Sequence, residues 1–326
     1  MKYLITGITG FAGPHLANLL HKEGHEVSGL VRCSNGREND IRDVVHDNVY
    51  SDIKFVYSDL TNHRLLDRIF NENEYDGVFH LAAQSHPPTS FVDPIGTMHD
   101  NVVGSANLIQ AITDNQPDCK MMFCSTSEVY GNVGIDGRKI EINDTVLPAN
   151  PYGASKAATD LYMQERMING QLEGFITRAF SHTGPRRGKN FSISSDAFQI
   201  ARMMKGMQEK TLLIGNLNSI RVVVDVRDTV NAYYLGMINE NTSMIYNVCG
   251  DTPRKMQYFT DKLIEISGLK DVVQKIHQPF YRPIDIHYQH GDSTELELDT
   301  NWKPVIDIET TLEDLLKYWC DKVGEQ

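Results

Sequence analysis

Tyr152 and Lys156 are the two side chains whose types and spacing most directly suggest proton chemistry. They are four residues apart, so a helix starting near Pro151 would place both on one face, one turn apart. A phenol has an ordinary pKa of about 10, and a nearby ammonium lowers that pKa by favouring the phenolate. Such a pair could take a proton from a sugar or alcohol hydroxyl while hydride leaves the same carbon. The same spacing also occurs on ordinary surface helices, so the interpretation requires a dinucleotide site upstream.

A second group of polar side chains comes shortly before this helix. Residues 125–131 read Ser-Thr-Ser-Glu-Val-Tyr-Gly and follow the apolar run at 121–123, which is typical of a buried strand. Ligand sites in open parallel sheets lie beyond the carboxyl ends of the strands. We therefore expect the hydroxyls and the carboxylate of this segment to face Tyr152 and Lys156.

The amino-terminal segment supplies the dinucleotide signal. Residues 2–6 predict a short buried strand, Gly7, Gly10 and Gly13 follow in a G-x-x-G-x-x-G turn, and a helical pattern continues through residues 16–20. Glycines in this context let backbone N–H groups approach a pyrophosphate at the positive end of a helix. The alternative is a plain tight turn without a ligand.

The end of the second strand, expected at residues 26–31, bears on which cofactor binds. An acidic residue there would hold the ribose 2′-hydroxyl of NAD, whereas this chain has Arg32, with Arg37 nearby, and arginine suits a 2′-phosphate. The sequence therefore favours NADP as the cofactor, and NAD remains an alternative. Arg32 could also be an ordinary solvated cation in a loop. Asp59, after a strand expected at 53–57, either meets the adenine edge or caps its own turn.

Strands expected at residues 77–81, 121–124 and 175–180 complete an alternation of strands and helices, with a long helix at 94–113 that contains Asn101. This order predicts an α/β fold with a doubly wound parallel sheet of the Rossmann type. We expect residues 1–178 to form the dinucleotide-binding domain, with later strands returning to it at about 217–232 and 245–250. Residues 179–326 would form mainly a smaller, interlocked substrate domain.

Composition bounds the class of protein. The 326 residues are 40% hydrophobic and 23% charged, as in ordinary globular proteins, and the net charge of −12 argues against nucleic acid and anionic membrane surfaces. Five scattered cysteines without a C-x-x-C pair suggest a reducing cytoplasm and neither disulfides nor a metal site. No signal peptide or membrane span is expected. The three cations of the loop at 181–191 indicate either an anion pocket or a solvated loop.

Taken together, these motifs resemble those of a known enzyme family. The glycine turn, residues 81–83 (Leu-Ala-Ala), 125–128 (Ser-Thr-Ser-Glu) and the Tyr152/Lys156 pair resemble the extended short-chain dehydrogenases/reductases. Within this superfamily the chain is most similar to the GDP-mannose 4,6-dehydratases. The segments that match are residues 83–86, 125–128, 185–188, 215–217 and 282–283. Matches in the same order along the chain run from residue 2 to about residue 304. The resemblance implies a nucleotide-sugar substrate, GDP-mannose or an analogue, and a homodimer or homotetramer.

The resemblance also implies roles. Tyr152, its pKa lowered by Lys156, would deprotonate the C4 hydroxyl with help from Thr126. Glu128 would take the C5 proton and pass it to the departing C6 hydroxyl, and the hydride moved from C4 to NADP would return to C6. Cofactor contacts are expected from Gly7, Thr9, Gly10, Phe11, Ala12, Gly13, Arg32, Asp59, Leu60, Leu81, Ala82, Ala83, Tyr152 and Lys156. Substrate contacts are expected from Ser85, His86, Glu128, Ser181, Arg187, Asn190, Asn216, Arg221, Arg282 and Asp285, with Arg187, Arg221 and Arg282 on the diphosphate and His86, like His182, in a supporting or structural place.

Several departures keep alternatives open. Ser181 stands where the dehydratases have an amide, residues 192–196 carry no cation where they have a basic cluster, and residues 221–223 read Arg-Val-Val instead of Arg-Asp-Trp. Cys33 replaces the second of two paired arginines. Another hexose or heptose, or another base, therefore stays open. The alternative activities are a 4-reductase or epimerase on the same fold, while a non-enzymatic cofactor sensor would not need the intact proton relay.

Overall fold

The computed structural model describes residues 1–32, 37–281 and 284–324. Among them, seven strands form one parallel sheet in the order β10-β6-β5-β4-β1-β2-β3. The strands of this main sheet are β1 (Lys2–Thr6), β2 (Glu26–Val31), β3 (Lys54–Tyr57), β4 (Gly77–His80), β5 (Lys120–Cys124), β6 (Gly174–Ala179) and β10 (Ile245–Val248). The predicted α/β fold with a parallel Rossmann-type sheet is confirmed.

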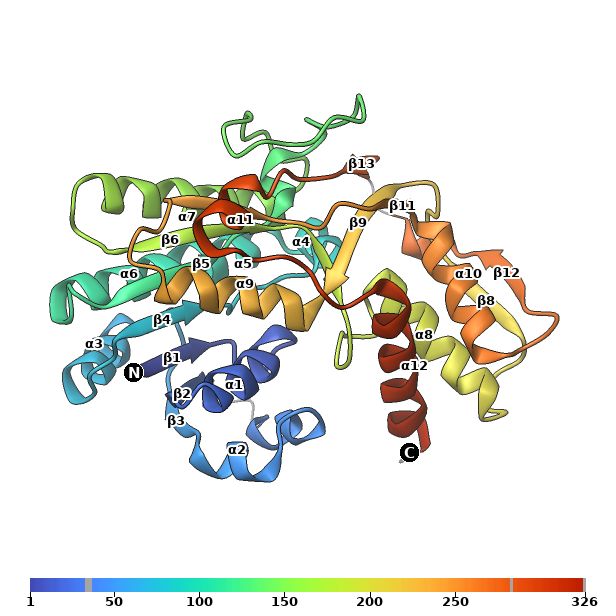
Figure 1. Ribbon diagram of the computed structural model, residues 1–326, viewed down its shortest axis with the longest axis horizontal. Coiled ribbons are helices and arrows are strands. Elements are labelled where there is room, and N and C mark those ends of the chain that lie inside the picture. Colours follow the sequence, from blue (N-terminus) through green and yellow to red (C-terminus); the bar gives the residue numbers. More distant parts are fainter. Residues whose placement is uncertain (33–36, 282–283, 325–326) are drawn as a thin grey trace.

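Helices cover both faces of the main sheet because neighbouring residues of each strand point to opposite sides. Tyr3 and Ile5 pack with apolar residues of α1 and α9, whereas Leu4 packs with those of α3 and α6. The helices on the first face are α1 (Ala12–Lys22), α2 (Asp47–Asp52), α9 (Val226–Ile238) and α11 (Thr294–Thr300). Those on the second are α3 (His63–Glu72), α6 (Gly104–Asn115) and α7 (Pro151–Ile168). Figure 1 shows α1 and α9 on the viewer's side of the sheet.

The helix expected at residues 94–113 is interrupted by one wider turn. It consists of α5 (Pro94–Met98), a π-helical turn at His99–Val103 and then α6. Asn101 lies inside this turn and is 1% exposed. Single π turns recur at functional sites because they redirect side chains inside an otherwise regular helix. The short helix α4 (Pro87–Val92) precedes it.

The carboxyl-terminal part forms a second lobe beside the ends of the main strands (Figure 1). Its strands are β7 (Ser181–Thr183), β9 (Ile220–Asp225), β11 (Pro253–Lys255) and β13 (Tyr288–Gln289) in one small sheet, and β8 (Thr211–Ile214) and β12 (Val273–Ile276) as a pair. Three helices share a core with this pair: α8 (Ser192–Met204), α10 (Met256–Ser267) and α12 (Ile308–Gly324). Short 3-10 helices lie at Glu38–Asp43 (η1), Ser127–Tyr130 (η3) and Gln278–Phe280 (η4).

One part of the expected strand arrangement is wrong. The strand within residues 217–232 is β9, and it pairs with β7, β11 and β13 instead of the main sheet. The main-sheet edge at β6 is already occupied by β10, which is the return expected at 245–250. Helix α9, which follows β9 directly, does pack on the main sheet through Val226, Val230 and Tyr233. The expected boundary at residue 178 falls one residue before β6 ends.

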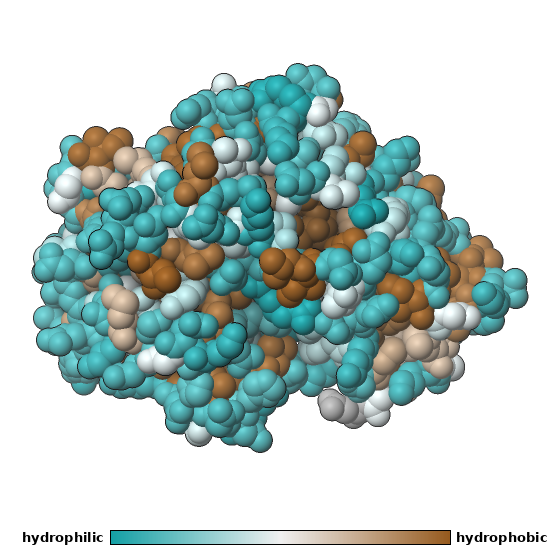
Figure 2. Space-filling view, in the orientation of Figure 1, coloured by the Kyte–Doolittle hydropathy of each residue, from teal (hydrophilic) through white to brown (hydrophobic). Residues whose placement is uncertain are grey.

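Hydrophilic side chains dominate the face shown in Figure 2, and its apolar groups are scattered in small clusters. None of the helices in the described ranges is both long and apolar enough to span a membrane. Cys119, Cys124, Cys249 and Cys320 are free thiols, while Cys33 lies outside the described residues.

Candidate functional site

A cavity of about 830 Å³ opens where the carboxyl ends of the main strands meet the second lobe. It brings together nearly all the residues predicted from the sequence, because the glycine turn lies there and the helix that carries Tyr152 begins there. Lining residues among those predicted are Gly7, Thr9, Gly10, Phe11, Ala12, Gly13, Arg32, Leu60, Leu81, Ala82, Ala83, Ser85, His86, Thr126, Glu128, Tyr152, Lys156, Ser181, Arg187, Asn190, Asn216, Arg221 and Asp285. Asp59 is not among the lining residues, and Arg282 lies outside the described residues.

Two of the three glycines of the turn leave no room for a side chain. Gly7 has a φ of +76°, and a Cβ there would lie 2.8 Å from the backbone nitrogen of Ala82. A Cβ on Gly13 would lie 2.5 Å from the Gly7 oxygen. Helix α1 starts in this turn, and its first turn carries no acidic residue. The turn thus presents free space and a positive helix end to the cavity, which fits the pyrophosphate of a dinucleotide.

Arg32, which follows β2, and Asp59, which follows β3, lie near each other. The guanidinium of Arg32 is 3.8 Å from the Asp59 carboxylate and 3.5 Å from that of Asp100, and the Arg32 side chain is 48% exposed. Asp59 also accepts hydrogen bonds from the backbone and the hydroxyl of Thr61, at 2.9 and 2.7 Å. Its observed contacts are therefore those of a turn cap, while Arg32 and Arg37 both line the cavity.

Tyr152 and Lys156 lie on α7 as predicted, but their electrostatics differ from the expectation. Burial raises the pKa of Tyr152, and the groups that oppose this rise are the Thr126 hydroxyl and the Arg187 guanidinium. The net shift of the Tyr152 pKa is therefore upward, opposite to the lowering expected from the charge of Lys156. Its Nζ instead lies 4.1 Å from the centre of the Phe123 ring, and burial lowers the Lys156 pKa to about 8.

Hydrogen bonds from other elements hold the start of α7. The Tyr152 backbone N–H donates to Ser90 Oγ at 3.1 Å. Asn101, in the π turn, donates through Nδ2 to Ser155 Oγ at 2.8 Å and to the Gln84 carbonyl at 3.0 Å. The wider turn therefore ties the segment after β4 to the helix that carries Tyr152 and Lys156.

Thr126 and Glu128 come from the segment after β5. Thr126 caps η3, its hydroxyl accepting from the Glu128 N–H at 3.3 Å, and it is 8% exposed. Glu128 is half-buried, and its Oε2 accepts a hydrogen bond from Asn150 Nδ2 at 2.6 Å. A carboxylate, two hydroxyls and an ammonium therefore share one wall of the cavity.

Arg187 lies between the two lobes. Its guanidinium stacks 3.7 Å from the Phe191 ring centre and 4.8 Å from that of Phe11, and burial lowers its pKa to about 10. Within the described part of the chain, this guanidinium forms neither a hydrogen bond nor an ion pair. A desolvated cation that faces a cavity without a carboxylate partner is suited to an anionic ligand.

A polar cluster from the second lobe also lines the cavity. Asp285 accepts a hydrogen bond from Asn216 Nδ2 at 2.6 Å and lies 3.6 Å from the Arg221 guanidinium. Of the departures from the dehydratase pattern, Ser181 and Val223 both line the cavity. These two differences from the dehydratase pattern therefore change the surface of the cavity.

Several cavity residues were not predicted from the sequence. Tyr233 of α9 reaches the cavity and contacts Cys124, with 3.4 Å between the hydroxyl oxygen and the sulfur. Asp196 of α8 is 3% exposed, accepts a hydrogen bond from Thr260 at 2.7 Å and has its pKa raised to about 7 by burial. Only the polar type of Asp196 inside an apolar helix pattern could have signalled it. Nothing in the local sequence around Tyr233 distinguishes it from a core residue.

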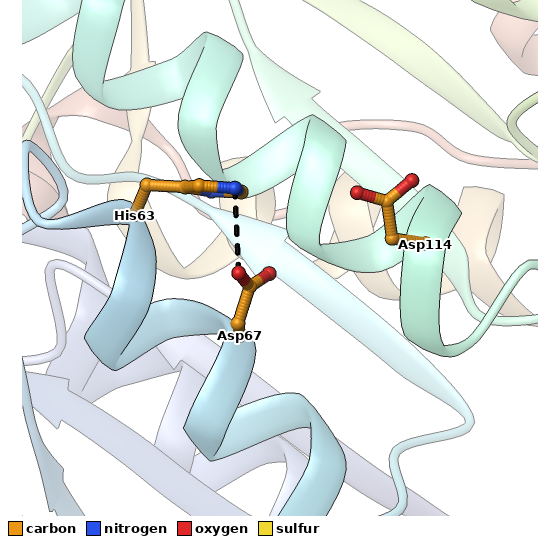
Figure 3. A group of neighbouring side chains, drawn as sticks. All are labelled: His63, Asp67 and Asp114. Atoms are coloured by element: carbon orange, nitrogen blue, oxygen red, sulfur yellow. Dashed lines mark ion pairs between the residues drawn. The ribbon is translucent and has the colours of Figure 1, made fainter.

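Outside the cavity, His63 and Asp67 of α3 and Asp114 of α6 gather on the surface (Figure 3). Each can direct a ligand atom to within 4.8 Å of the others. Their contacts are those of a helix–helix surface: His63 Nε2 lies 3.3 Å from Asp67, and Asp114 accepts from Gln110 at 2.7 Å. The His63 and Asp67 side chains are 43% and 34% exposed, so their contact lies at the solvated surface.

Comparison with known proteins yields one family. A model of the family described as GDP-mannose 4,6 dehydratase matches residues 4–315. The chain is 31% identical to the GDP-6-deoxy-D-mannose reductase of Pseudomonas aeruginosa, over 77% of this chain and 82% of that protein. It is also 31% identical to GDP-mannose 4,6 dehydratase 2 of Arabidopsis thaliana, over 94% of this chain and 83% of that protein.

Among solved structures, the RMD protein of Pseudomonas aeruginosa in complex with NADPH superposes with a TM-score of 0.81 and 27% identity. The match covers 98% of this chain and 99% of that one. The likeness therefore includes both the main sheet and the second lobe.

Proposed function

This chain belongs to the GDP-mannose 4,6-dehydratase family, and we propose that it is an NADP-dependent dehydratase that converts GDP-mannose to GDP-4-keto-6-deoxymannose. The observation that carries the proposal is the placement of Glu128 in the same cavity wall as Thr126, Tyr152 and Lys156. An alcohol oxidation alone needs the hydroxyls and the ammonium. A carboxylate beside them supplies the additional base that elimination of water requires.

The cofactor is a nicotinamide dinucleotide, and the glycine turn, Arg32 and Arg37 would hold it. When bound, its oxidised ring supplies the hydride acceptor for C4 and a positive charge that favours the Tyr152 phenolate. The two arginines at the cavity wall support a 2′-phosphate, hence NADP. Titration with NADPH and with NADH tests this choice: we expect NADPH to bind more tightly, and equal affinity would contradict it.

Each protein group then has one task. Tyr152 takes the proton of the C4 hydroxyl, with Thr126 hydrogen-bonded to the phenol. The resulting C4 ketone acidifies the C5 hydrogen, which Glu128 removes. The proton now on Glu128 leaves with the C6 hydroxyl as water. The 4-keto-6-deoxy product is complete when C6 receives the hydride that left C4, which the bound cofactor would hold in the meantime, and C5 regains a proton. Arg187, Arg221 and Asn216 line the part of the cavity that would receive the diphosphate and nucleoside.

Mass spectrometry of the enzyme incubated with GDP-mannose and catalytic NADP tests the activity. We expect a product lighter by one water, without net accumulation of NADPH. An unchanged substrate mass would contradict the proposal and direct attention to Ser181 and Val223, where this cavity departs from the dehydratase pattern.

A second candidate is a 4-reductase, because the similar protein of Pseudomonas aeruginosa is named as a GDP-6-deoxy-D-mannose reductase. The same Tyr152 and Lys156 could donate a proton to a 4-keto group during reduction. A 4-keto-6-deoxy nucleotide sugar with NADPH separates the two, since a reductase would oxidise the cofactor stoichiometrically and a dehydratase would not.

We also propose that the enzyme is a cytoplasmic homo-oligomer. Ile95 and Val103 lie on α5 and the π turn, Leu161 and Ile168 lie on α7, and all four are 43–78% exposed. The helices that carry them contact one another, so these apolar groups support a shared interface. Light scattering of the purified protein is expected to give a dimer or tetramer mass, and a monomer mass would contradict this.

A further inference from the structure

Asn150 links the start of α7 to the carboxylate of Glu128. Its Oδ1 accepts from the Gly153 N–H at 2.8 Å, which caps the helix, and its Nδ2 donates to Glu128 Oε2 at 2.6 Å. The side chain is 7% exposed, so water competes little with either bond. One buried amide thus connects the helix that carries the phenol base to the carboxylate base.

The two bonds determine which way the amide faces. A backbone N–H can only donate, so the atom opposite Gly153 must be the carbonyl oxygen of the Asn150 amide. The nitrogen must then face Glu128, where it can only donate. Glu128 Oε2 is consequently held as an acceptor, and a proton on this oxygen would point against the amide hydrogens.

The backbone around Asn150 makes this arrangement stiff. Asn150 is extended, with φ −150° and ψ 163°, as expected for a residue before proline, and Pro151 occupies the first turn of α7. A Cβ on Gly153 would lie 2.7 Å from the Glu128 carbonyl oxygen, so the helix start packs directly against the Glu128 backbone. The amide therefore has little freedom to swing away from the carboxylate.

We propose that Asn150 is a positioning residue that reserves Glu128 Oε1 for the proton moved from C5 to the C6 hydroxyl. This rests on the proposed dehydratase function. In the step itself, an Oε1 lone pair takes the C5 proton and the C5–H electron pair forms the C5–C6 double bond. The C6–O bond breaks, and the Oε1 proton leaves with that oxygen as water. Atoms and charge balance without another reactant.

Asn150→Ser separates helix capping from carboxylate positioning. Serine is as good a helix cap as asparagine, but its short hydroxyl does not place a donor on Glu128. Asn150→Ala removes both functions. Asn62→Ser is the matched control, because the Asn62 side chain caps α3 in the same way, accepting from the Leu65 N–H at 3.2 Å on the exposed surface.

The experiment measures the rates of two steps of one turnover separately. The rise in NADPH absorbance after mixing with GDP-mannose reports C4 oxidation, and the appearance of the dehydrated product reports the C5–C6 step. In Asn150→Ser we expect an unchanged melting temperature and C4 oxidation, with dehydration slower by about 10–100-fold, the loss of one hydrogen bond to a charged group. Asn150→Ala should show the same slow step and a lower melting temperature, and Asn62→Ser should leave both steps unchanged.

Two results would overturn the inference while the proposed function stands: dehydration by Asn150→Ser at the wild-type rate, or an equal slowing of both steps. The first would make the amide only a helix cap, and the second would make it a general support of the cavity. If the wild-type enzyme itself forms no dehydrated product, the proposed function fails and the role of Asn150 in that step fails with it.

Discussion

Arg186 and Asp43 form an ion pair in which the two side chains are only 8% and 10% exposed. The same guanidinium donates to the backbone oxygens of Gly10, at 2.9 Å, and Thr9, at 3.1 Å. Asp43 also accepts from the Tyr318 hydroxyl of α12 at 2.9 Å. These contacts join three segments: the loop after β7, the glycine turn and the carboxyl-terminal helix α12.

Asp43→Asn should weaken both stability and cofactor binding. Removing one charge of a buried pair leaves the other uncompensated, so we expect unfolding free energy to fall by about 3 kcal/mol. NADPH affinity should fall as well, because Arg186 would no longer hold the turn firmly. Denaturant unfolding and NADPH titration measure the two effects. Asp47→Asn is the control, because Asp47 pairs with Arg42 at the surface and its side chain is 89% exposed. Equal losses of stability and of NADPH affinity in the two variants would contradict the prediction.

Tyr152→Phe should abolish turnover and leave cofactor affinity nearly intact. The substitution removes only the hydroxyl that receives the C4 proton, and the ring still fills the same buried position, which is 9% exposed. Turnover and NADPH titration on the same preparation check both halves. Wild-type turnover in this variant would exclude Tyr152 as the base.

Glu128→Gln should stop the reaction after C4 oxidation. The amide cannot take the C5 proton, whereas the hydroxyl and phenol needed for the first step remain in place. Stopped-flow absorbance should therefore show NADPH forming from bound NADP and persisting, with at least a 100-fold loss of dehydrated product, the lower end of general-base contributions. If the variant dehydrates normally, another group is the base.

Catalysis should decline as pH rises above about 8, the value to which burial lowers the pKa of Lys156. A lysine with a lowered pKa is charged below that pH and neutral above it, so the ammonium that supports the Tyr152 phenolate disappears on the alkaline side. The pH profile of kcat/KM reports groups of the free enzyme. In Lys156→Arg the decline should move to higher pH, because guanidinium stays charged. If the alkaline side of the profile does not move in this variant, the decline comes from the titration of another group.

Asp196→Asn should stabilise the protein at alkaline pH relative to wild type. The Asp196 pKa is raised from 3.8 to about 7, so the folded state disfavours its charge, and the stability present below about pH 4 is lost as pH rises through 7. With about 1.4 kcal/mol per pKa unit, the penalty at pH 8 is at most a few kcal/mol. Unfolding of both proteins at pH 5 and pH 8 checks this. A difference that does not grow with pH would mean that Asp196 is ionised at both.

Local patterns in the sequence were sufficient for much of the site. The glycine turn, the α7 start at Pro151 and the polar segment after β5 follow from steric and capping rules that act within a few residues. Parallel strands then bring their carboxyl ends to one edge of the sheet, so Thr126, Glu128, Tyr152 and Lys156 had to meet.

Tertiary structure decided what depends on residues distant in sequence. Which strand takes the edge at β6 is a competition between β9 and β10 that no local pattern expresses. The Lys156 ammonium lies against Phe123, and the Tyr152 pKa is raised, because burial is a property of the assembled core. The Asn150–Glu128 and Arg186–Asp43 contacts join residues 22 and 143 positions apart. Desolvation and side-chain geometry come from packing, so only the folded chain determines them.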